Sequence, residues 1–413
     1  MKQLSKKMGL VLSLLVLSNV LQARENYQQF SSNTLRNTII EVENLATNQH
    51  QTISGANLNG IDAWVDETKI NWRTSDLGDL GDMNEQRLSV EVKLKNGDQI
   101  DAEQDILNMG QVKTELKFSA LLEKKLKNKY ITLINYLEQE KRQKTLQQHH
   151  QVSLSELNNW KMKVSSDSFR ADKLQQADFS LDDVWAEETE NRTILNRFKK
   201  RLGSDHAGYS SDGIISIQQM LEYTQHILDS QSYLQHSNAI RNAEFEMGLA
   251  NKKRQRSDAR EQFSLNSIKV EYDNDDDNYG ATVGIKLPIT RNSYDALLEK
   301  QEVHYSNIDA QNKVIDTADQ LQEKQFQLQN LQDEWRRTQH LLQNIHNRIR
   351  RLGSTGNVDL MIDLKTKSLQ FLKRQDSVLI NALRQYVDFL TIAGMLSAKP
   401  YRNWLQTGTP RIL

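Results

Sequence analysis

The stretch that decides the fold is LNSIKVEYDNDDDNYGATVGIKLP, at residues 265–288. Apolar and polar residues alternate on both sides of its acidic turn at 273–278. After the turn, Val283 and Ile285 share the apolar face, and the polar or small residues that alternate with them share the opposite face. A period of two with one apolar face predicts a β-hairpin that is apolar on one side and wet on the other. Pro288 closes the second strand, because it has no N–H to donate to a neighbour.

A very long helix is expected after this hairpin. Its last part carries an a/d seam, with positions at alternating steps of three and four, for about four heptads. The seam consists of Leu328, Leu331, Trp335, Thr338, Leu342, Ile345, Ile349 and Leu352. Taken alone, the seam also fits a plain coiled-coil stalk, and the strands also fit a soluble sandwich with one buried face.

The same order of elements occurs twice in the chain. VEVKL at 90–94 returns as VGIKL at 283–287. Each copy precedes a helix of about sixty residues, a short polar tip and a returning helix, which is the signature of an internal repeat. In the first copy we expect the long helix from about 102 to 164, interrupted only by Gly110. The predicted fold class is mostly α, with long antiparallel coiled-coil helices and two β-hairpins.

The repeat divides the chain into segments. We expect a signal peptide at 1–23, a first helical segment at 24–62, a β-hairpin at 63–96, a long helix with tip and returning helix at 97–200, a connector at 201–213, a helix at 214–263, a second β-hairpin at 264–289, a second long helix with tip and returning helix at 290–399, and a C-terminal tail at 400–413. The tail is expected to be irregular.

Residues 1–23 have the composition of a secretory signal peptide. Three lysines form a basic start, residues 8–21 are mostly apolar, and Ala23 offers a cleavage point. The apolar run is too short and wrongly flanked for a stable membrane span. These residues are therefore left out of the predicted fold.

Composition excludes several classes of function. The chain has 53 basic and 54 acidic residues, and no segment carries a dominant basic stripe, so no nucleic-acid partner is expected. It has no cysteine, which excludes disulfides and thiolate chemistry. Only three prolines occur, which favours long helices.

Motifs for catalysis are missing from the sequence. We find no P-loop, nucleophile elbow, HExxH or glycine-rich nucleotide fingerprint, so we expect no enzyme and no cofactor. The histidines at 149, 150, 340 and 346 lack the i,i+4 spacing of a metal site, and no metal is expected. The acidic run at 275–277 lacks the spacing of a calcium-binding EF-hand, and a solvated loop is the simpler interpretation.

At this point the sequence resembles the outer-membrane efflux (TolC-like) family. The doubled order of elements carries the resemblance, together with VGIKLPI at 283–289, the turn and acids at 353–363, and the last helix from Asn381 to Gly394. The likeness covers nearly all of the chain after residue 23. The chain departs from the family in its short first helix and in acids at 359 and 363 that are four apart, where the family usually has three.

The resemblance implies an outer-membrane protein of a Gram-negative bacterium, with most of the chain in the periplasm. Such proteins are homotrimers in which each subunit gives four strands to one twelve-stranded barrel, and the helices form a periplasmic tunnel. The tunnel meets a periplasmic adaptor and an inner-membrane transporter, in efflux or type I secretion. The alternative is a periplasmic coiled-coil adaptor or structural protein without a membrane barrel. An adaptor should have more β-sequence after its helices, and no β-segment follows residue 358 here.

Candidate site residues follow from the strands and the tip. Each group shares one role. The expected lipid face carries Val90, Val92, Val283 and Ile285, and the expected barrel lumen carries Lys93, Lys269 and Lys286. The expected periplasmic tip, gate and adaptor contact comprises Arg348, Arg351, Gly353, Ser354, Asp359, Asp363 and Asp167.

Two interpretations of the tip stay open. Basic residues at a helix C-terminus and acids at the next N-terminus suit both helix dipoles. Alternatively, arginine–aspartate contacts across the turn hold the periplasmic end closed until an adaptor displaces them. Asp359 and Asp363 lie one turn apart, so they share a helix face.

Overall fold

A computed structural model describes residues 35–47, 64–76, 84–167, 169–202, 213–260, 264–273, 278–286, 294–352, 357–409 and 411–412. The expected signal peptide, most of the connector at 201–213, the run at 275–277, Gly353 and Ser354 lie outside the described residues. The chain forms two compact units. Unit 1 comprises Met1–Val42, Ala120–Ser237 and Thr317–Leu413, and unit 2 comprises Glu43–Ser119 and Asn238–Asp316.

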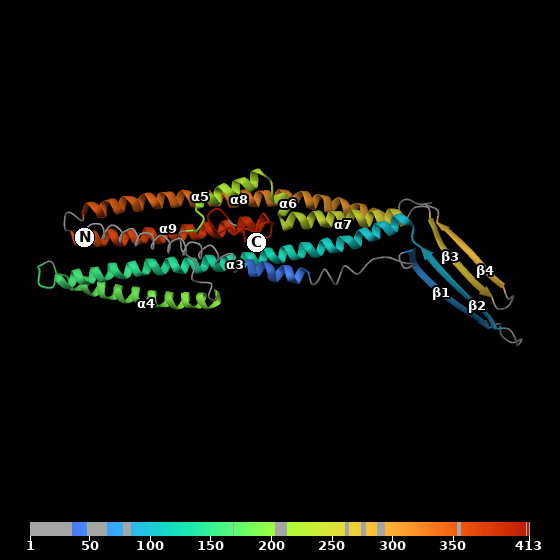
Figure 1. Ribbon diagram of the computed structural model, residues 1–413, viewed down its shortest axis with the longest axis horizontal. Coiled ribbons are helices and arrows are strands. Elements are labelled where there is room, and N and C mark those ends of the chain that lie inside the picture. The colour runs from blue at the N-terminus through green and yellow to red at the C-terminus, as the bar shows by residue number, and fades with distance from the viewer. Residues whose placement is uncertain are drawn as a thin grey trace, which may run out of the picture. The chain divides into compact units, whose positions relative to one another are not determined.

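Unit 2 contains a four-stranded antiparallel sheet. Its strands are β1 (Val65–Asp76), β2 (Asn84–Leu94), β3 (Ser264–Asp273) and β4 (Asn278–Lys286), in the order β1-β2-β3-β4 (Figure 1). The two predicted hairpins are therefore joined into one sheet by the pairing of β2 with β3.

The register of this sheet aligns like residues across all four strands. Val92 faces Ile268, which in turn faces Val283, and Glu91 faces Lys269 on the other side of the sheet. Because side chains alternate along a strand, this register gathers the apolar residues on one face and the polar residues on the other. The predicted alternation is confirmed.

The helices of unit 2 are tied together by polar contacts near the strands. They are α7 (Asn238–Arg260) and the first parts of α3 (Gly97–Met162) and α8 (Tyr294–Leu352). Lys252 of α7 forms an ion pair with Asp105 of α3 at 2.7 Å. The expected interruption at Gly110 was wrong, because α3 runs through it without a break; one glycine costs only about 1 kcal/mol in a helix.

The single helix expected at 214–263 is three helices in the structure. They are α5 (Ile217–Asp229), α6 (Tyr233–His236) and α7. Ser216 and Gln219 begin α5 with a reciprocal capping box, and Gln231 leaves the helical region with a φ of 50°. A non-glycine residue at positive φ interrupts a helix, which is why the expected boundary was wrong.

Unit 1 is a helical bundle with an irregular segment packed into it. Besides parts of α3 and α8 it contains α4 (Ala171–Leu202), α5, α6 and α9 (Val358–Ile392). Its fully buried core includes Tyr130 of α3 and Tyr386 and Phe389 of α9. A helix also covers residues 35–47, and its Leu35 and Ile39 are buried.

The segment after α9 is irregular, as expected, but it is largely buried. Tyr401, Asn403 and Trp404 are all less than a tenth exposed. The hydroxyl of Tyr130 donates to the carbonyl of Arg402 at 3.0 Å and accepts from the N–H of Trp404 at 3.3 Å. The C-terminal segment is therefore part of the core of unit 1.

Gly394 allows this segment to turn away from α9. It has a φ of 72°, and a Cβ there would collide with the backbone of His236. Only glycine satisfies both conditions without strain.

Across the residues that the structure describes, no helix is both long enough and apolar enough to cross a membrane.

Candidate functional site

The apolar face of the sheet is exposed. On β1, Trp72 is 70% exposed, and on β4, Val283 and Ile285 are each 58% exposed. Val90 and Val92, on the inner strand β2, are half-buried on the same face. A soluble sandwich would bury such a face against a second layer. Exposed apolar surface that is continuous across strands indicates a surface that meets lipid or another protein.

The opposite face of the sheet is polar and ion-paired. Lys93 lies 2.7 Å from Glu67, and Lys269 lies 3.0 Å from Glu271. Both lysines are half-buried. Lys286 ends β4, where its backbone pairs with Ser264, and its side chain lies outside the described residues. Two of the three candidate lumen lysines therefore lie on one face with neutralising acids.

Small residues allow the strands to pack closely on the polar face. Ser89 and Ser267 are buried there, and Gly284 is the register partner of Ser267. A Cβ on Gly284 would lie 2.5 Å from the Ser267 hydroxyl oxygen, well inside van der Waals contact. The polar face is therefore tightly packed at these small residues, which lie between half-buried charged residues.

The tip of unit 1 joins the end of α3 to the start of α9. Asn357 caps α9 by accepting the N–H of Leu360 at 3.1 Å. This cap places Asp359 in the first helical turn, where an acid suits the helix dipole. Asp359 accepts hydrogen bonds at 2.6 Å from Lys163 and from the side-chain amide of Asn159.

These bonds determine the electrostatics of the tip. The hydrogen bond from Lys163, followed by that from Asn159, holds the pKa of Asp359 below its ordinary value. The Lys163 ammonium also lies 4.6 Å from the ring centroid of Trp160, within cation–π range. Near Asp363, burial and the charge of Asp363 raise the pKa of Glu156.

The predicted tip residues are only partly brought together. Asp359 bonds with Lys163 and Asn159 of the first repeat, whereas one of the two open interpretations placed arginines from before the turn against it. Arg348 and Arg351 are exposed at the end of α8, and Asp167 is exposed in the turn after α3. Lys163 and Asn159 were missed because their partner, Asp359, is about two hundred residues away in sequence.

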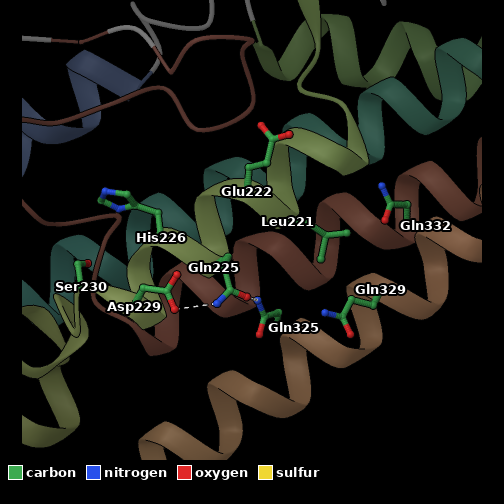
Figure 2. Close-up of a pocket in the computed structure, with 9 residues that line it drawn as sticks. All are labelled: Leu221, Glu222, Gln225, His226, Asp229, Ser230, Gln325, Gln329 and Gln332. Carbon is green, nitrogen blue, oxygen red and sulfur yellow. Dashed lines mark hydrogen bonds between the residues drawn. The ribbon is translucent and has the colours of Figure 1, made fainter.

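Unit 1 also has hollows beside α5. One, of about 730 Å³, lies between α5 and α8 and is lined by many side-chain amides (Figure 2). In Figure 2, Gln225 lies between Asp229 and Gln325; it donates to Asp229 at 2.7 Å and accepts from Gln325 at 2.5 Å. These hydrogen bonds occupy the polar side-chain groups at the centre of this hollow. Among the described residues, no cluster of three or more His, Asp or Glu could hold a metal ion.

No family model and no curated protein matches the sequence. Several solved structures are similar across most of the chain, among them VceC, CusC and CmeC. The outer membrane protein VceC of Vibrio cholerae has a TM-score of 0.57 at 12% identity and covers 91% of this chain and 96% of its own. CusC, whose crystal structures concern folding and transmembrane channel formation, has a TM-score of 0.54 at 14% identity. The match covers 90% of this chain and 92% of CusC.

The third is the CmeC outer membrane channel of Campylobacter jejuni. Its TM-score is 0.54 at 12% identity, and the match covers 94% of this chain and 87% of that one. At such low identity the likeness concerns the fold. The predicted fold class of the single chain, mostly α with two β-hairpins, is thereby confirmed, and the chain has the fold of a subunit of these outer-membrane channel proteins.

Proposed function

We propose that the chain is a subunit of an outer-membrane export duct, which gives passage from the periplasm to the exterior. The observation that carries the proposal is the sheet, which exposes an apolar face and presents an ion-paired polar face on the other side. Lipid would cover the first face, and a water-filled lumen would suit the second. The likeness to outer membrane channels supports this assignment.

The sheet needs further copies of the chain to close. Edge strands in lipid would leave unpaired backbone groups, so only a closed barrel is stable there. With four antiparallel strands in the order β1-β2-β3-β4, the edges β1 and β4 run in opposite directions. Therefore β4 of one copy can pair antiparallel with β1 of the next, and rotation closes a ring. Three copies, as the family resemblance implies, make a twelve-stranded barrel.

In this proposal the helices form the periplasmic part of the duct. Val90, Val92, Val283 and Ile285 face lipid, and Lys93, Lys269 and Lys286 face the lumen. The tip, with Arg348, Arg351, Gly353, Ser354, Asp359, Asp363 and Asp167, meets a periplasmic adaptor that links it to an inner-membrane transporter. The transporter supplies the energy, in efflux or type I secretion, and the duct itself performs no chemistry.

Extraction and conductance together test the proposal. Membranes that contain the full chain are washed with alkaline carbonate and then with detergent, and the detergent-released protein is added to planar bilayers. A barrel resists carbonate, requires detergent and gives discrete conductance steps. Release by carbonate without conductance would instead assign a periplasmic coiled-coil protein.

A further inference from the structure

A second hollow in unit 1, of about 750 Å³, lies between α5 with α6 and the C-terminal segment. Its volume is within the range of small-molecule sites, roughly 300–1,000 Å³. Most of the surface exposed to the hollow is apolar. The apolar part includes Tyr223 and Ile227 of α5 and Met395 and Trp404 of the C-terminal segment. None of the lining residues belongs to the sheet or to the tip, so the inference does not depend on the proposed duct.

Charged groups of the lining favour an anion. Lys399 and Arg402 lie in the C-terminal segment, and Glu222 of α5 is the one carboxylate in the described lining. Glu222 accepts a hydrogen bond from Gln218 at 3.2 Å. Arg402 makes no ion pair with any residue that the structure describes. The described lining therefore carries two permanent cations, Lys399 and Arg402, and one carboxylate.

Trp404 forms part of the wall of the hollow. Its side chain is 95% buried, being 5% exposed, and its ring lies edge-on to Tyr223 with centroids 6.3 Å apart. Its indole N–H has no acceptor among the described residues. That nitrogen has less than 1 Å² of accessible surface, so Trp404 contributes a mainly apolar wall to the hollow.

We propose that this hollow binds a small amphipathic monoanion, with an apolar body and a single carboxylate-like head. Arg402, aided by Lys399, pairs with the head, because a guanidinium presents a donor fork that matches a carboxylate. The body packs against Tyr223, Ile227 and Met395, where burial of apolar surface is favourable.

The test uses two probes of nearly equal shape, 4-phenylbutanoate and its neutral amide. Isothermal titration calorimetry measures their affinities for the full chain in lipid nanodiscs. We expect the acid to bind at least about tenfold more tightly than the amide, because a hydrogen bond to a charged group is stronger. The double variant Lys399→Gln/Arg402→Gln should remove that difference, and Arg336→Gln/Lys365→Gln, at exposed positions of α8 and α9, should keep it.

A steric variant tests the location without touching the charges. Ala398→Trp places a large ring at the lining and should abolish binding of both probes while circular dichroism stays unchanged. Equal affinity of acid and amide for the unmodified chain, or no measurable acid binding, would overturn the proposal. So would acid binding that survives both the double variant and Ala398→Trp, since the anion would then bind elsewhere or partition into lipid.

Discussion

The ammonium nitrogen of Lys163 lies 2.6 Å from both carboxylate oxygens of Asp359. Lys163 follows the long helix α3 of the first repeat, and Asp359 lies in the first turn of α9 in the second repeat. The contact therefore ties the tips of the two repeats to each other. Asn159 adds a hydrogen bond to the same carboxylate at 2.6 Å.

Breaking this contact should loosen the tip. Asp359→Ala or Lys163→Gln is expected to raise single-channel conductance in planar bilayers without adaptor, if the tip closes the duct at rest. An exposed pair contributes only about 0–1 kcal/mol, so the effect depends on repetition in each subunit of the assembly. Asp359→Ala/Asp363→Ala should resemble Asp359→Ala, because Asp363 acts on the acid Glu156.

The control for the tip is a pair that joins no helices. Arg170 and Asp172 form an exposed ion pair two residues apart, so Asp172→Ala should leave conductance unchanged.

The pH dependence of the Lys163–Asp359 contact has a fixed sign. Because the pKa of Asp359 is lowered, its contact is fully present above about pH 4 and is lost as pH falls through the lowered pKa. Conductance that is insensitive to Asp359→Ala and to acid would leave the pair as an ordinary helix-end contact.

Glu123 is expected to destabilise unit 1 at alkaline pH. The side chain is 3% exposed and accepts the N–H of Ser397 at 2.9 Å, and burial raises its pKa to about 7. As pH rises from about 4.5 through 7, the unfolded chain gives up this proton more readily than the folded chain, so stability falls. Glu123→Gln keeps an acceptor without the charge, and it should stabilise the protein by on the order of 3 kcal/mol above pH 8.

Thermal unfolding at two pH values measures this effect. The Tm gain of Glu123→Gln over the unmodified chain should be several degrees at pH 8.5 and small at pH 5. Glu190→Gln, at an exposed position of α4, serves as the matched control and should change neither value. An equal Tm gain at both pH values would show that the carboxyl does not titrate in this range.

Lys93 should influence ion selectivity if the polar face lines the lumen. Lys93→Glu places an acid beside Glu67 in the proposed pore, and the reversal potential in a salt gradient should shift toward cation selectivity. Lys124→Glu makes the same charge change at an exposed position of α3 and should shift it far less. Selectivity that is the same in both variants would remove Lys93 from the pore.

Gly284 should tolerate alanine only when Ser267 loses its hydroxyl. Gly284→Ala brings a Cβ within 2.5 Å of the Ser267 oxygen, and such overpacking typically costs about 1–3 kcal/mol. The heat stability of the assembled protein should fall in Gly284→Ala and recover in Gly284→Ala/Ser267→Ala. Additive losses in the double variant would mean that the two positions are not in contact.

The sheet could be predicted from sequence because its information is local. Alternation around Val283 assigns each side chain to a face, and the repeated pentapeptide identifies the first hairpin. The break at Gln231 could not be predicted, since it depends on one residue at positive φ in a sequence of helical character. Burial of the tail around Trp404 was also missed, because it arises from contacts with Tyr130, far away in the chain.

The tip shows the same limit. The sequence placed Asp359 at a helix start, which is correct and follows from the capping residue Asn357. It also suggested arginine partners, since Arg348 and Arg351 end the helix that precedes the turn. The observed partner, Lys163, belongs to the other repeat, and no local pattern indicates how two repeats align their ends.

The central claim, that the apolar face of the sheet meets lipid and the polar face does not, is tested most directly at two adjacent residues of β4. Val283 lies on the apolar face and Thr282 on the other, at nearly the same depth. The measurement is the yield of heat-modifiable oligomer in outer membranes for Val283→Arg and Thr282→Arg. Val283→Arg should lose most of the oligomer, because arginine on a lipid face costs about 2–4 kcal/mol near the midplane, and Thr282→Arg should keep it. Equal yields, or loss confined to Thr282→Arg, would contradict the account.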